Sequence, residues 1–128
     1  MICESRFPVA VASKSPVHTV SPVVYDHFPV YKENAREYCS IDTKEFGEML
    51  MMEVGALMVG KIVNHAQEKA PVQRGAEKGY FQFGGSTVIL LTKKGAVQVD
   101  GDILQNSANG YETIVKYGEK IGIAANHT

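Results

Sequence analysis

Turn-forming residues recur along this chain at short intervals, and this spacing constrains the fold more than any other feature. Twelve glycines are spread through the 128 residues, and with Pro, Asn and Asp they separate short β-branched segments about every ten residues. Helix bundles need longer periodic segments, whereas sandwiches and barrels use short strands and tight corners. The sequence therefore predicts an all-β domain, either a β-sandwich or a barrel-sandwich hybrid.

Seven segments fit short strands, and three others fit turns. Residues 46–52 also contain the helix formers Met and Leu, but Gly55 and Gly60 follow closely, so a strand is predicted there. No element is predicted in the first fifteen residues. We expect residues 1–16 to be poorly defined and residues 17–128 to form one domain. The predicted strands are 17–24, 36–41, 48–54, 57–63, 87–91, 97–99 and 113–116, and the predicted turns are 42–47, 93–95 and 100–102.

Charge and hydropathy exclude several classes of protein. The formal net charge of −1 argues against nucleic-acid binding driven by bulk charge. The longest uncharged apolar run, residues 54–60, is far shorter than the roughly 20 residues of a transmembrane helix. The first residues lack the basic start and apolar stretch of a signal peptide. We expect a protein of the cytoplasm or of the cytoplasmic membrane face.

Residues able to bind metal or act as acids are scattered. The four histidines are not spaced by four residues, so they predict no metal site on a helix, and Cys3 and Cys39 form no CxxC pair. Glu53 stands out because it lies within an apolar run. Strand alternation would place it with Met49 and Met51, where a carboxylate must be paired, exposed or functional. Of the three, we expect it to be exposed.

A glycine-rich tetrapeptide, Gly84-Gly85-Ser86-Thr87, precedes a strongly apolar segment. A phosphate-binding P-loop requires GxxxxGK[ST] before a helix, and a dinucleotide site requires GxGxxG. Neither pattern is present. Taken alone, the tetrapeptide predicts a turn.

Its surroundings are more specific. Residues 79–91, GYFQFGGSTVILL, resemble the self-cleavage segment of the phosphatidylserine decarboxylase family. Three further segments resemble other blocks of that family, in the expected order, so the resemblance runs from about residue 17 to residue 123. These segments are VGALMVGKIV at 54–63, YKENAR at 31–36 and NGYETIVKYG at 109–118.

The resemblance implies an enzyme that makes its own cofactor. In the family, the serine matching Ser86 attacks the carbonyl matching Gly85, and the ester then eliminates and hydrolyses to a pyruvoyl group. Glycines permit the strained backbone that this attack requires. The cleavage would give chains 1–85 and 86–128. The pyruvoyl ketone would condense with the substrate amine and withdraw electrons as carbon dioxide leaves. The substrate implied is phosphatidylserine, or a free amino acid as in related members.

The resemblance also implies residues that the matching segments do not contain. A serine nucleophile needs a base, which in the family is a His, supported by an Asp, from the part before the block matching residue 17. Residues 1–16 contain no His. His18 is the candidate substitute, provided that the fold brings it within hydrogen-bond reach of Ser86, and His65 comes next.

We expect this chain to correspond to the C-terminal half to two thirds of a complete enzyme. Such a chain would expose an apolar face or an unpaired strand edge. It would therefore associate with itself or with a second chain that completes the fold.

Two alternatives stay open. The chain could be a relative that does not cleave and instead acts as a β-rich binding or assembly module. It could also be a biotinyl- or lipoyl-type carrier, because the glycine-rich run suits a barrel-sandwich shape. Carriers present a Lys between Met residues at a hairpin tip, and Lys93-Lys94-Gly95 lacks that flank. Cleavage at Gly85–Ser86 separates the first alternative from the enzyme.

Overall fold

The computed structural model describes residues 2–5, 34–56, 62–65, 70–82 and 86–125. Within these residues the chain folds into antiparallel strands with one short helix. This confirms the predicted all-β class. No helix in the described part is long and apolar enough to cross a membrane.

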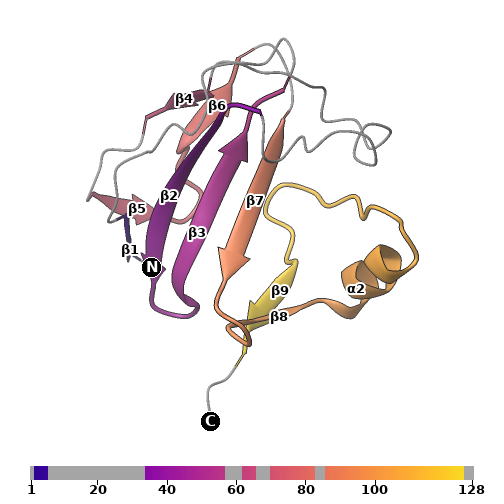
Figure 1. Cartoon of the computed structure of the whole chain (residues 1–128). Coiled ribbons are helices and arrows are strands. Elements are labelled where there is room, and N and C mark those ends of the chain that lie inside the picture. Colours follow the sequence, from indigo (N-terminus) through magenta and orange to yellow (C-terminus); the bar gives the residue numbers. More distant parts are fainter. Residues whose placement is uncertain (1, 6–33, 57–61, 66–69, 83–85, 126–128) are drawn as a thin grey trace.

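The main sheet has five strands in the order β5-β1-β2-β3-β7. Its centre is the hairpin of β2, Arg36–Thr43, and β3, Gly47–Val54, which stand side by side in Figure 1. Strand β7, Thr87–Thr92, pairs with the other edge of β3, and β1, Ile2–Ser5, lies between β2 and β5, Pro71–Gln73. The predicted strands 36–41, 48–54 and 87–91 are thus confirmed.

The β2–β3 hairpin turns where the sequence predicted it. Thr43 Oγ1 accepts a hydrogen bond from the backbone N–H of Phe46 (2.9 Å) and donates one to the carbonyl of Gly47 (2.9 Å). Gly47 has φ +68°, which strains any residue that carries a Cβ. The turn fixes the register, so Glu53 shares a face with Met49 and Met51, as the alternation predicted.

Two small sheets flank the main one. Strand β4, Ile62–Asn64, pairs with β6, Gly79–Phe81, beyond the end of β3 (Figure 1). Strand β8, Val97–Val99, follows the predicted 93–95 turn and pairs with β9, Gly122–Ala124. Between β8 and β9 lies helix α2, Gly101–Ala108.

Burial among the described residues concentrates where β2 begins and β3 ends. Asn34, Ala35, Glu53, Val54 and Ala56 are buried there, Cys39 and Ser40 are buried farther along β2, and Ala96 is buried just before β8. Burial raises the pKa of the Cys39 thiol; nearby Lys78 opposes this effect, and Glu53 adds to it. The best-packed part of the described fold therefore lies next to the segment that contains Ser86.

Several predicted elements were wrong. Residues 113–116 form no strand, because no described segment pairs with them, and Ile114 is 96% exposed. The predicted 100–102 turn is the start of α2, with Asp100 at the N-cap and Asp102 in the first turn, where acidic residues favour a helix. Strands β1, β5, β6 and β9 were not predicted. Of segment 57–63 only the last two residues are described, in β4, and segment 17–24 lies outside the described residues.

Candidate functional site

Ser86 is held at the point where β7 begins. Its hydroxyl donates a hydrogen bond to the backbone carbonyl of Val54, the last residue of β3. Val54 is fully buried, and it lies opposite Thr87 in the sheet register. Pairing of β3 with β7 therefore brings Ser86 to Val54, and the hydroxyl is fixed by backbone rather than by a mobile side chain.

A second set of contacts ties the start of β2 to the end of β3. Asn34, fully buried, donates from Nδ2 to the carbonyl of Gly55 (2.8 Å), and the N–H of Gly55 donates to the carbonyl of Ala35 (2.7 Å). Arg36 Nε donates to the carbonyl of Asn34 (3.0 Å). Buried backbone groups need such partners, so these contacts fix the backbone next to Val54.

Three of the four sequence blocks therefore meet at one place. Asn34 comes from block 31–36, Val54 and Gly55 come from block 54–63, and Ser86 comes from block 79–91. In block 109–118, Tyr117 is 94% exposed and its hydroxyl donates to the carbonyl of Gly75 (3.4 Å). Gly85 and His18, the other candidate site residues, lie outside the described residues.

We expect Asn34→Ala to lower the free energy of unfolding by about 1–3 kcal/mol, because the buried carbonyl of Gly55 would lose its donor. Denaturant unfolding measures this loss. Asn106→Ala is the matched control, because it removes the hydrogen bond from Asn106 Nδ2 to Thr113 Oγ1 (2.9 Å) beside the solvent-exposed helix α2. If both variants lost the same free energy of unfolding, the buried hydrogen bond from Asn34 to Gly55 would contribute no more than the part-buried one from Asn106 to Thr113.

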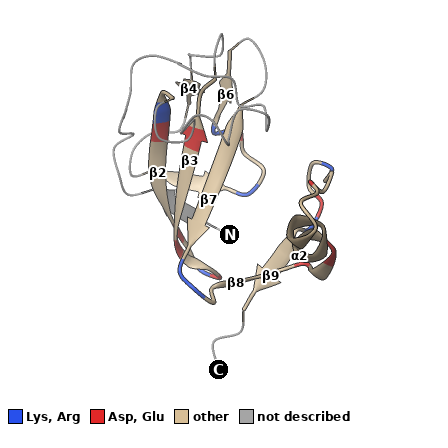
Figure 2. Ribbon diagram, turned by 45° about the vertical axis from the view of Figure 1, so that its right-hand side comes forward, with Lys and Arg blue, Asp and Glu red and all other residues tan. Residues whose placement is uncertain are grey.

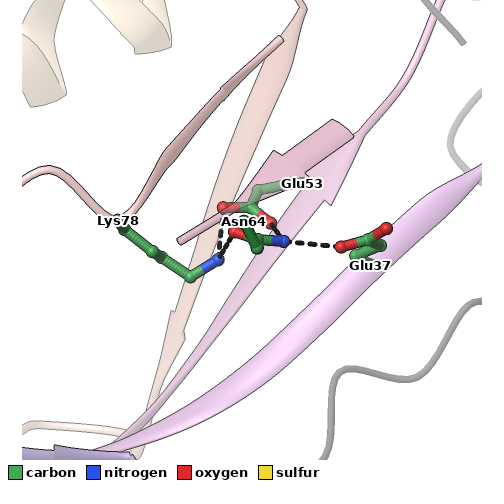
Figure 3. A network of polar contacts seen from close by, with 4 residues as sticks. All are labelled: Glu37, Glu53, Asn64 and Lys78. Atoms are coloured by element: carbon green, nitrogen blue, oxygen red, sulfur yellow. Dashed lines mark hydrogen bonds and ion pairs between the residues drawn. The ribbon is translucent and has the colours of Figure 1, made fainter. Parts of the chain in front are cut away.

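Glu53 is paired, and the expectation that it would be exposed was wrong. Its side chain is 8% exposed and accepts from Lys78 Nζ (2.6 Å) and Asn64 Nδ2 (3.1 Å). Asn64 also donates to Glu37 (2.5 Å) and accepts from Lys78 (2.5 Å), as Figure 3 shows. Figure 2 shows charged positions at the start of β2 and the tip of β3. Sequence reasoning missed Glu37, Asn64 and Lys78; the one signal was the carboxylate within an apolar run, which needs a partner when buried.

His65, the second candidate base, lies at the end of β4. It is half-exposed, its Nδ1 lies 3.2 Å from Glu77 Oε1, and its ring contacts Tyr80 edge to face at 5.5 Å. None of these contacts reaches Ser86. Among the described residues, no group of three or more His, Cys, Asp or Glu side chains is arranged to hold a metal ion.

Comparison with known proteins covers the part of the chain that contains the four sequence blocks. The family model for phosphatidylserine decarboxylase matches residues 10–123. Phosphatidylserine decarboxylase proenzyme 2 of Clostridium acetobutylicum is 50% identical over 106 residues, which cover 83% of this chain and 36% of that protein. Proenzymes of Clostridium botulinum (strain Hall) and Desulfitobacterium hafniense are 43% and 40% identical over 123 residues, 95% of this chain and 40% of each relative.

The chain thus spans 36–40% of the length of these curated relatives, a smaller share than the half to two thirds expected from the sequence. No solved structure matches.

Proposed function

This chain belongs to the phosphatidylserine decarboxylase family, and from this membership we propose that it carries the self-cleaving segment of a pyruvoyl-dependent decarboxylase. In this proposal residues 17–128 are the catalytic domain, Ser86 is the nucleophile and Gly85 supplies the carbonyl that is attacked. The observation that supports it best is the placement of Ser86, whose hydroxyl is anchored on Val54 where three family blocks meet.

Self-cleavage would proceed through atoms of the chain itself. Ser86 Oγ attacks the carbonyl carbon of Gly85, a C–O bond forms, and the Gly85–Ser86 amide C–N bond breaks to give an ester and a free amine. A base then removes the Cα proton of residue 86, and the Gly85 carboxylate leaves, which gives dehydroalanine. Water hydrolyses the tautomeric imine, so ammonia departs and a pyruvoyl group caps residues 86–128. The two glycines before Ser86 can adopt backbone conformations that are strained for other residues, and the attack requires such a conformation.

The surroundings of Ser86 fit such a group. The residue is half-buried, and its backbone enters β7 beside the buried end of β3, so a small planar group there would be partly shielded from water. Once formed, a pyruvoyl ketone supplies an electron sink for loss of a carboxylate as carbon dioxide. Serine attack needs a base. We propose His18 as the substitute base within this chain and His65 as the next candidate, unless a second chain supplies it.

The proposed substrate is phosphatidylserine, with phosphatidylethanolamine as the product, because the matched relatives are named phosphatidylserine decarboxylase proenzymes. A free amino acid carries the same amine and carboxylate and is the alternative head group. A phospholipid substrate would require contact with a membrane surface, which we place on its cytoplasmic side.

We also propose that the chain associates with itself or with a second polypeptide. In the described sheet β7 has β3 as its only neighbour, and its Val88, Leu90 and Leu91 are 47–50% exposed. Unpaired edges with apolar side chains favour pairing with another chain. The matched relatives contain more than twice the length of this chain, which is sufficient polypeptide to cover these residues.

An intact mass of the purified chain under denaturing conditions tests the proposed function. We expect two fragments that together replace the 14.0 kDa chain and divide between Gly85 and Ser86. The smaller one should carry a carbonyl that reacts with hydroxylamine. A single unreactive chain of full mass would contradict self-cleavage by this chain and would favour the binding or assembly module.

A further inference from the structure

Two consecutive residues of β3 hold the two sides of the proposed cleavage segment. The side chain of Glu53 pairs with Lys78 Nζ at 2.6 Å, and the carbonyl of Val54 accepts the hydroxyl of Ser86. Lys78 and Ser86, which flank the proposed cleavage segment, are therefore attached at neighbouring positions of one strand. We infer that Lys78 is a positioning residue for self-cleavage, an inference that rests on the proposed function.

The contacts of Lys78 fit positioning rather than proton transfer. Its side chain is 16% exposed, and its ammonium already donates to Glu53 and to Asn64 Oδ1. Lysine is rarely buried unless it is paired. A partly buried ammonium with two acceptors holds the backbone of Lys78 close to β3.

Asn64 makes this attachment rigid. Glu37 and Glu53 lie directly opposite each other on β2 and β3, where like charges repel. Asn64 Nδ2 donates to both carboxylates, at 2.5 Å and 3.1 Å, while Lys78 supplies the positive charge (Figure 3). The four side chains therefore connect β2, β3 and β4 with the residue before β6.

The backbone around Lys78 is fixed as well. The N–H of His65 donates to the carbonyl of Lys78 (2.7 Å), and Asn64 lies opposite Gly79 in the β4–β6 pair. A Cβ on Gly79 would lie 2.2 Å from the carbonyl of Val63 and 2.9 Å from Asn64 Oδ1. Strand β6 is thus packed tightly against β4, and four residues separate its last residue, Phe81, from Ser86.

Attack within a chain is sensitive to such placement, because an error of about 1 Å between reacting groups can cost about a hundredfold in rate. Ser86 is fixed from the downstream side by β7 and Val54. Lys78 attaches the upstream side to the same strand through Glu53. Loss of this attachment would leave the nucleophile in place and free the group that it attacks.

The test compares self-cleavage rates of wild type and variants, with thermal midpoints measured on each. We expect Lys78→Met to slow cleavage about ten- to hundredfold and Lys78→Arg, which keeps the charge, to recover most of the rate. Since Lys78→Met leaves Glu53 buried without its cation, the double variant Glu53→Gln/Lys78→Met removes both charges and should stay slow. Lys120→Met is the matched control, because it breaks the exposed 2.8 Å pair with Asp100 and should cleave at the wild-type rate.

Amide hydrogen exchange of residues 79–82 gives a second readout that does not depend on cleavage. Lys78→Met should increase exchange there, and Lys120→Met should not. Wild-type cleavage rates in Lys78→Met, or in the double variant, would overturn the positioning role. If the wild type itself does not cleave, the proposed function fails, and the positioning role in cleavage fails with it. Exchange then tests only the structural part of the inference: increased exchange in Lys78→Met but not in Lys120→Met supports the attachment of residues 79–82 by Lys78, and unchanged exchange overturns it.

Discussion

Ser86→Ala should yield a single chain of about 14 kDa in which no fragment divides between residues 85 and 86. The substitution removes the oxygen that attacks Gly85, and no other group can take its place in the ester. Folding should be little affected, since one hydrogen bond to Val54 is lost, which costs about 1 kcal/mol. Intact mass under denaturing conditions, measured with the thermal midpoint, separates loss of chemistry from loss of structure.

Ser107→Ala is the control for this result. Ser107 lies on the exposed surface of α2, so this variant should cleave at the wild-type rate. Fragments ending at residue 85 in Ser86→Ala would show that Ser86 is not the nucleophile.

Gly79→Ala should lower the free energy of unfolding by about 3 kcal/mol, the upper range for overpacking. Its Cβ would lie 2.2 Å from the backbone carbonyl of Val63, and a paired carbonyl cannot move away without breaking the β4–β6 ladder. Denaturant unfolding gives the free energy, and hydrogen exchange shows whether β4 and β6 open.

Gly101→Ala is the matched control for Gly79→Ala. No atom lies within 4 Å of a Cβ at Gly101, and the residue begins α2. Here the substitution should be neutral or stabilise the fold by up to about 1 kcal/mol, since alanine reduces the freedom of the unfolded chain. If Gly79→Ala and Gly101→Ala lowered the free energy of unfolding equally, the close approach of Gly79 to Val63 would not be the cause of the destabilisation.

The sequence predicted the fold best where a strand was long enough to show a pattern. Strands β2, β3 and β7 span six to eight residues and carry enough alternation to be recognised. Strands β5, β6 and β9 have three residues each, too few for any period. Helix α2 was missed because Gly101 between two aspartates fits a turn as well as a helix start.

The candidate site was predicted in parts. The sequence blocks were identifiable one by one, but their meeting depends on the β3–β7 register, which no local pattern specifies. The prediction that Glu53 is exposed was wrong for a reason that local sequence cannot reveal. Its partner Lys78 lies 25 residues away, so the sequence showed a carboxylate in an apolar run without the cation that neutralises it.

The position of β7 has a consequence for any cleaved form of the protein. This strand begins one residue after Ser86 and pairs with β3 over six positions, from Thr87 opposite Val54 to Thr92 opposite Met49. After cleavage, β3 and β7 would belong to two different polypeptides, which would remain paired in the central sheet. Chain termini are ordinarily poorly ordered. The new N-terminus at residue 86 would instead be followed directly by a strand paired with β3, so the other polypeptide would hold the reactive end in place.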